Sequence, residues 1–151
     1  MKGTQVNIVP FTCNLSNLTV FTTDSDAAYS DTILRQDEPF SLRVTVEFGG
    51  PGAIALMPLL LSIKVNFFAT PYCPDPKVEL GHATVTTIAG VFTYTPTLSV
   101  ARPTKVGLVS EQIYHIGALL RAGAPDWPAL VTGFIEGLSI QIYNLPPPLG
   151  Q

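Results

Sequence analysis

The chain has 151 residues, of which 46% are hydrophobic and only 13% are charged, and its formal net charge is −3. A disordered chain needs the opposite balance of apolar and charged residues, so the composition excludes one. A phosphate-binding surface needs clustered Lys and Arg side chains, whereas the basic residues here are scattered singly along the chain. We therefore expect a folded domain with no nucleic-acid partner.

The beginning of the chain bears on the compartment. Residues 1–5 are polar and lack the charged and apolar regions of a secretory signal, so we expect a cytoplasmic protein. In a reducing compartment, Cys13 and Cys73 are predicted to be free thiols. The longest apolar run, residues 53–61, is far shorter than the roughly 20 residues that a transmembrane helix needs. No transmembrane segment is predicted.

Alternation of apolar and polar side chains with period two predicts most of the elements. It runs without a break from Phe40 to Phe48, and Pro96 should place a later strand at an edge or a bulge. In chain order, strands are predicted at residues 6–11, 18–22, 40–48, 61–67, 83–88, 92–98 and within 129–143. The expected core comprises Leu42, Val44, Val46, Ile63, Val65, Tyr94, Ile140 and Ile142. Negligible helix is expected outside residues 113–122.

Residues 113–122 fit either a strand or a short helix, and Gly117 within an all-β context favours the strand. Residues 125–128 are expected to form the turn before the last strand. About eight strands separated by Pro and Gly residues predict an all-β fold, a two-sheet antiparallel β-sandwich of immunoglobulin-like or similar Greek-key topology. We expect one domain over residues 1–144, followed by a proline-rich tail at 145–151.

The segment Ser110-Glu111-Gln112-Ile113-Tyr114-His115-Ile116 resembles the approach to the penultimate strand of immunoglobulin-like domains. In that fold a Tyr near the start of the strand turns its hydroxyl back onto upstream backbone. Tyr114 takes that place, and Ile116 takes the place of the usual cysteine. The chain departs from the family because it lacks the cysteine pair and the strand-C tryptophan. The resemblance implies a structural corner and no activity.

No group of residues predicts catalysis, a metal site or a cofactor. The two histidines, His82 and His115, fall in predicted strands, and the phase of His115 places it on the solvent face. Residues 24–38 are rich in Asp and Glu but lack the glycine and the terminal glutamate of a calcium-binding EF-hand. We interpret them as a solvated loop, and calcium binding there stays open.

The connection at residues 49–61 is unusual because it is almost wholly apolar, although connections between strands are normally polar. Either it packs over the open end of the sandwich, which we favour, or it meets another protein, a lipid surface or an apolar ligand. Trp127, between two prolines, is either a contact aromatic or, as we favour, a plug over the core edge. The candidate contact residues are Ile54, Leu56, Met57, Leu59 and Trp127.

Three functions remain open on this basis. The leading hypothesis is a non-catalytic interaction module that binds another protein or associates with itself as a homo-oligomer. The second is a carrier or membrane-surface module that holds a lipid or another apolar ligand. The third is an enzyme that uses isolated carboxylates or histidines, which the sequence does not group. The low charge and the apolar connection favour the first.

Overall fold

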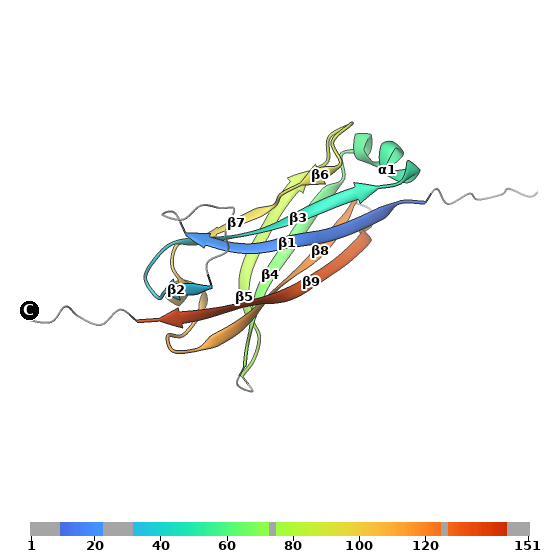
Figure 1. Cartoon of the computed structure of the whole chain (residues 1–151). Coiled ribbons are helices and arrows are strands. Elements are labelled where there is room, and N and C mark those ends of the chain that lie inside the picture. Colours follow the sequence, from blue (N-terminus) through green and yellow to red (C-terminus); the bar gives the residue numbers. More distant parts are fainter. Residues whose placement is uncertain (1–9, 23–31, 73–74, 125–126, 145–151) are drawn as a thin grey trace, which may run out of the picture.

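The computed structural model describes residues 10–22, 32–72, 75–124 and 127–144, without the side chains of 127–130. Within these residues nine strands form two sheets that pack face to face (Figure 1). The strands are β1 (Thr12–Thr22), β2 (Ile33–Arg35), β3 (Phe40–Gly49), β4 (Ser62–Pro71), β5 (Val78–Thr86), β6 (Thr93–Tyr94), β7 (Thr97–Val100), β8 (Ile113–Ala124) and β9 (Trp127–Tyr143). The predicted all-β, two-sheet sandwich is confirmed.

The smaller sheet is centred on β3, which pairs with β1 on one side and with β6 and β7 on the other. The larger sheet has the order β2-β9-β8-β4-β5. All the pairings are antiparallel except that of β2 with β9, where Ile33 lies opposite Gln141 in a parallel ladder. A strand of three residues carries too little periodicity to be recognised, so the sequence did not predict β2 or its parallel pairing.

The core lies between the sheets and follows the alternation in the sequence. In β3 the side chains of Phe40, Leu42, Val44, Val46 and Phe48 point inward and are buried. Every residue of the expected core is buried, with Tyr94 the most exposed of them at 6%. The period of two therefore identified the buried face of each main strand correctly.

Residues 113–122 form part of β8, as favoured, and β8 lies between β4 and β9 in the larger sheet. Gly117 leaves room there for the Phe68 ring, because a Cβ at this position would lie 2.6 Å from the Cζ atom of Phe68 and the ring would have to shift. The Tyr114 hydroxyl accepts a hydrogen bond of 2.9 Å from the backbone N–H of Val109. Tyr114 therefore makes the corner that the resemblance implies, and Ile116 is fully buried.

Two expectations need correction, and two others concern residues that are largely or wholly outside the description. The strand predicted at 92–98 is divided into β6 and β7, because Pro96 interrupts it while both pieces pair with β3. The expectation of negligible helix outside 113–122 is wrong, since the structure has α1 (Pro51–Leu56) and the 3₁₀ turns η1 (Met57–Leu59) and η2 (Pro103–Val106). The strand predicted at 6–11 and the tail lie largely or wholly outside the described residues.

No helix in the described part of the chain is long and apolar enough to cross a membrane.

Candidate interaction site

The apolar connection between β3 and β4 folds into α1 and η1 for local reasons. Gly50 has a φ of 86°, and a Cβ there would lie 2.8 Å from the carbonyl oxygen of Pro10. Pro51 follows as the first helical residue, a position where its missing N–H costs nothing. The N–H of Gly52 then donates to the same Pro10 carbonyl over 2.9 Å. The end of β3 is thereby turned into a helix across the end of the sandwich.

Met57 is a correction to the candidate contact residues. Its side chain is fully buried in the core, so it cannot contribute to an exposed contact surface. Its sulfur lies 3.6 Å from the hydroxyl of Tyr94, whose ring packs edge-on against Phe48. Met57 therefore anchors the connection to the sandwich.

A buried threonine fixes the connection to the turn that precedes β6. The Thr87 hydroxyl donates to the carbonyl of Met57 over 2.9 Å and accepts the N–H of Leu61 over 2.8 Å. The Thr87 N–H donates to the Leu61 carbonyl over 2.9 Å. Thr87 is the fully buried polar residue within the described chain. Sequence reasoning missed it, because one threonine among those of residues 84–87 carries no distinguishing pattern.

Tyr94 holds the same turn from the other side. Its hydroxyl accepts the N–H of Ile88 over 2.9 Å and donates to the carbonyl of Val91 over 2.6 Å. The turn is closed by the Val91 N–H, which donates to the Ile88 carbonyl. The two loops therefore form one supported surface at the end of the sandwich, where Figure 1 shows α1 beside the turn before β6.

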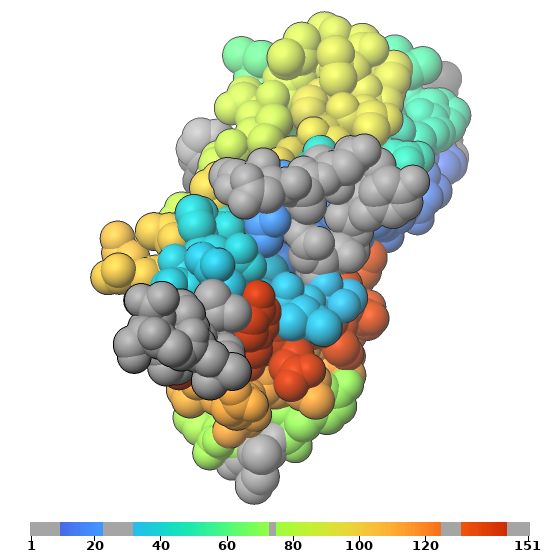
Figure 2. Space-filling view, turned by 60° about the vertical axis from the view of Figure 1, so that its left-hand side comes forward, coloured from blue at the N-terminus to red at the C-terminus, as the bar shows by residue number. Residues whose placement is uncertain are grey.

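Aliphatic side chains cover this end. The two loops expose Ile54 (68%), Leu59 (64%), Leu60 (66%), Ile88 (58%) and Val91 (39%), which we call the apolar apex. Figure 2 shows the residues around 85–98, in yellow-green, gathered at the upper end, with those of the α1 segment, in green and teal, beside them. Leu56, another candidate contact residue, is half-buried and packs against the core.

Leu60 stands out because its backbone is left-handed, with a φ of 56°, and its side chain is exposed. This conformation costs an L-residue other than Gly or Asn roughly 1–2 kcal/mol. A leucine at this position is therefore unfavourable both for the local backbone and for solvation. Local conflicts of this kind are expected at functional sites.

The two loops that form the apex carry no charged residue. No Asp, Glu, Lys or Arg occurs in residues 48–63 or in residues 80–101. Beside α1 lies a shallow hollow of about 290 Å³, lined by Phe48, Gly49, Gly50, Ala53, Ile54 and Phe92. The two loops of the apex therefore contribute aliphatic side chains and no charged side chain to this surface.

Trp127, the remaining candidate contact residue, is the first residue of β9 and lies opposite Ala124. Its side chain is outside the described residues, so its predicted role as a plug or a contact stays a prediction.

The acidic segment shows local pairing where it is described. Residues 24–31 lie outside the described chain. Asp37 forms an ion pair with Arg35 at 3.2 Å, and a Glu38 carboxylate oxygen accepts the backbone N–H of Arg35. The described residues contain no group of three or more His, Cys, Asp and Glu side chains that could hold a metal ion.

The histidines lie on the outer face of the larger sheet. His82 is exposed on β5, and His115 is half-buried beside Tyr72, with the two rings 4.2 Å apart. The Ser139 hydroxyl lies 3.4 Å from Nδ1 of His115 and 3.0 Å from the Tyr72 hydroxyl. A serine beside an imidazole is a nucleophilic pair only if a third group orients the base and a cavity excludes water. This cluster lies open on a sheet surface, which favours a polar contact over catalysis.

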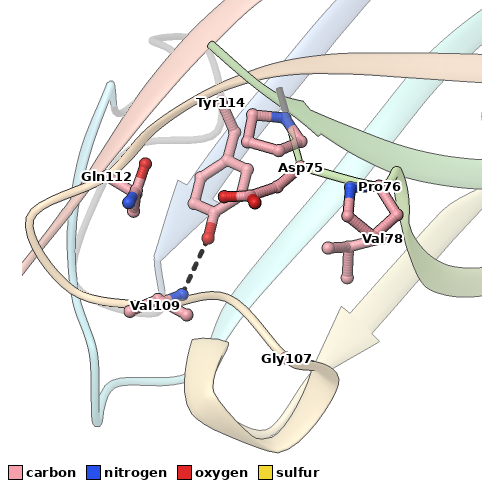
Figure 3. Close-up of a pocket in the computed structure, with 8 residues that line it drawn as sticks. Asp75, Pro76, Val78, Gly107, Val109, Gln112 and Tyr114 are labelled. Atoms are coloured by element: carbon pink, nitrogen blue, oxygen red, sulfur yellow. Dashed lines mark hydrogen bonds between the residues drawn. The ribbon is translucent and has the colours of Figure 1, made fainter. Parts of the chain in front are cut away.

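A second hollow, of about 220 Å³, lies at the opposite end of the sandwich, beneath the tyrosine corner (Figure 3). Its polar groups are the Asp75 carboxylate, the Gln112 amide and the Tyr114 hydroxyl, which accepts the Val109 N–H. The Tyr114 hydroxyl thus has a structural partner, the backbone N–H of Val109.

No protein-family model and no curated protein sequence matches this chain. Similar solved structures include a β-glucosidase from Listeria innocua in complex with glucose (12% identity, TM-score 0.45, covering 91% of this chain and 17% of that chain). Another is the sporulation control protein Spo0M from Bacillus subtilis (9% identity, TM-score 0.43, covering 91% of this chain and 51% of that chain). A third is AggA, the major subunit of aggregative adherence fimbriae type I from Escherichia coli (9% identity, TM-score 0.38, covering 95% of this chain and 100% of that chain). The chain thus spans about one sixth of the β-glucosidase, and at these scores no function is carried over.

Proposed function

We propose that this protein is a non-catalytic β-sandwich module that acts by protein–protein binding, and that two copies associate through the apolar apex. The observation that carries the proposal is the set of exposed aliphatic side chains at one end of the sandwich, on two loops without charged residues. Exposed apolar patches on soluble domains commonly mark interaction sites. A second copy of the chain is the partner that matches the apex best, since it presents the same apolar surface across a two-fold axis.

The expected strength follows from the exposed fractions of the apex side chains. Full burial of an aliphatic side chain stabilises by roughly 1.5–3 kcal/mol, so covering the apex contributes roughly 4–9 kcal/mol per copy. Association costs about 4–15 kcal/mol in lost freedom of motion. Covering the apex of two copies, roughly 9–18 kcal/mol, therefore offsets this cost with a small surplus, and we expect a weak, reversible dimer with a dissociation constant on the order of 10–100 μM.

Light scattering over a dilution series tests the proposal. The unmodified chain should have the mass of a dimer well above about 100 μM and that of a monomer near about 1 μM. Ile54→Asp with Leu59→Asp should abolish the dimer, while circular dichroism shows an intact fold. Ile33→Asp with Val109→Asp is the matched control, because both side chains are 58% exposed and lie outside the apex.

Leu60→Asn gives a second variant that keeps the protein folded. Asn tolerates the left-handed backbone of this position better than Leu, so stability should be retained or raised by up to about 1 kcal/mol. Association should nevertheless weaken, because an exposed aliphatic side chain is removed. A monomeric unmodified chain at about 100 μM, or equal dissociation in the control variant, would contradict the proposal.

The hollow beside α1 supports a second candidate, a module that holds a lipid or another apolar ligand. The hollow is lined by apolar side chains and glycine, and Ile54 connects it to the apex. Under this alternative the protein sediments with neutral phosphatidylcholine vesicles, and Ile54→Asp abolishes the effect. Vesicle binding by a chain that stays monomeric favours this candidate over self-association.

A further inference from the structure

The outer face of the larger sheet carries two cations directly opposite each other. Lys64 on β4 pairs across the ladder with Arg121 on β8, and both side chains are exposed. The same row continues to Thr84 on β5 and Thr132 on β9. Directly opposite side chains have Cβ atoms about 5 Å apart, and like charges placed in this way destabilise a sheet.

No carboxylate compensates this pair among the described residues. Their ion pairs are Arg35 with Asp37 and Lys77 with Glu79, and neither involves Lys64 or Arg121. The acidic residue on β9 of this face, Glu136, lies opposite Gly117, four residues from Arg121 along β8 and hence about 13 Å away. In a chain with a net charge of −3, this row is a local excess of positive charge.

An aromatic surface adjoins the cations. One step along the sheet, Phe134 lies opposite Leu119, and its side chain is 55% exposed. Its ring stacks on that of Phe68, with centroids 5.8 Å apart and an angle of 20° between the planes. Phe68 itself lies against Gly117, which leaves room for the ring on the sheet surface. Phe134 is thus held by its neighbour and still open to solvent.

We propose that this strip, formed by Lys64, Arg121, Phe134, Thr84 and Thr132, binds an anionic polysaccharide. The apolar C–H face of a sugar ring packs on the exposed surface of Phe134, since the face of an aromatic ring carries negative charge. A carboxylate on the neighbouring part of the chain binds to the Arg121 guanidinium and the Lys64 ammonium. Successive rows lie about 7 Å apart, so both contacts fall within one short stretch of an extended polymer.

The position of the strip argues against the other anionic polymers. β4 and β8 are interior strands, so an acidic peptide finds no free strand edge with which to pair. Nucleic acid needs a more extended basic surface than two cations in a negatively charged chain. The strip lies on the outer face of the sheet and runs across several strands, which suits an extended polymer better than a small molecule.

Calorimetry with a galacturonate hexamer tests the proposal, with a dextran oligomer as the neutral control. The unmodified chain should bind the hexamer and not dextran, and salt should weaken the binding. Lys64→Gln with Arg121→Gln should weaken it about tenfold or more. Arg102→Gln with Lys105→Gln removes the same charge at exposed positions near η2 and should leave the affinity unchanged. Phe134→Ala should also weaken binding, and Phe134→Leu does the same test if the alanine variant unfolds.

Misfolding cannot explain a loss of binding in the charge variant, because removing a like-charge pair should leave the melting temperature equal or higher. Absence of hexamer binding overturns the proposal. So does an equal loss in the Arg102 and Lys105 variant, which means that only net charge matters. Single-stranded DNA or polyaspartate binding as tightly as the hexamer also overturns it, because the strip then does not recognise a saccharide. None of these outcomes depends on the apolar apex.

Discussion

Thr87 supplies the sharpest test of how the apex is supported. Replacing it by valine keeps the shape of the side chain and removes its hydroxyl. The Leu61 N–H then loses its 2.8 Å acceptor in a buried position, while the Met57 carbonyl keeps only the Leu60 N–H at 3.4 Å. A buried polar group without a partner costs about 1–3 kcal/mol. We expect Thr87→Val to lower the free energy of unfolding by about 2–3 kcal/mol.

Urea denaturation followed by circular dichroism measures this loss, and the slope with urea should stay unchanged. Thr87→Ser is the control, because it keeps both hydrogen bonds and removes one methyl group, at a cost of about 0.8 kcal/mol. The reasoning is refuted if Thr87→Val is as stable as the unmodified protein, or if serine costs more than valine. Either result would mean that packing of the methyl group, and not hydrogen bonding, fixes the two loops.

Three further predictions follow from single contacts. Gly117→Ala should lower the free energy of unfolding, measured by thermal unfolding, by about 1–3 kcal/mol, because the added Cβ collides with the Phe68 ring. Unchanged stability would contradict the close contact between Phe68 and Gly117. Tyr114→Phe should cost about 1 kcal/mol in the same assay, and no loss would mean that the corner hydroxyl is dispensable. Burial raises the pKa of the Cys13 thiol above its ordinary value of 9.0, so in a Cys73→Ser background a thiol reagent should react more slowly with the native than with the unfolded chain. Because the pKa is higher in the folded state, the Cys13 thiol contributes to the free energy of unfolding at pH values below its ordinary pKa, and this contribution should be lost as the pH rises through the raised pKa. Equal reaction rates of the native and the unfolded chain would refute the burial of Cys13.

The sequence predicted the main strands because each of them buries one face. The alternation from Phe40 to Phe48 arises because one side of the strand faces the core and the other faces solvent. The core residues of this strand could therefore be predicted from it. Tyr114 was likewise predictable, because its hydrogen bond spans only five residues of the chain. Structural features that depend on such local patterns can be predicted from a single sequence.

The sequence predicted the apex only in part. A continuous apolar run has no period, so the sequence could not separate the buried Met57 from the exposed Ile54 and Leu59. The division depends on Thr87, which lies 30 residues from Met57 along the chain. Cys13 is a free thiol as predicted, whereas Cys73 is outside the described residues and its state stays a prediction.

The most direct test of the apex as a contact surface is a series of amide chemical-shift spectra recorded on dilution from about 500 μM to about 20 μM. The account predicts concentration-dependent shifts confined to the backbone amides near Ile54, Leu59, Leu60, Ile88 and Val91. Shifts that follow a strand edge or the outer face of the larger sheet, or no shifts over this range, would contradict it.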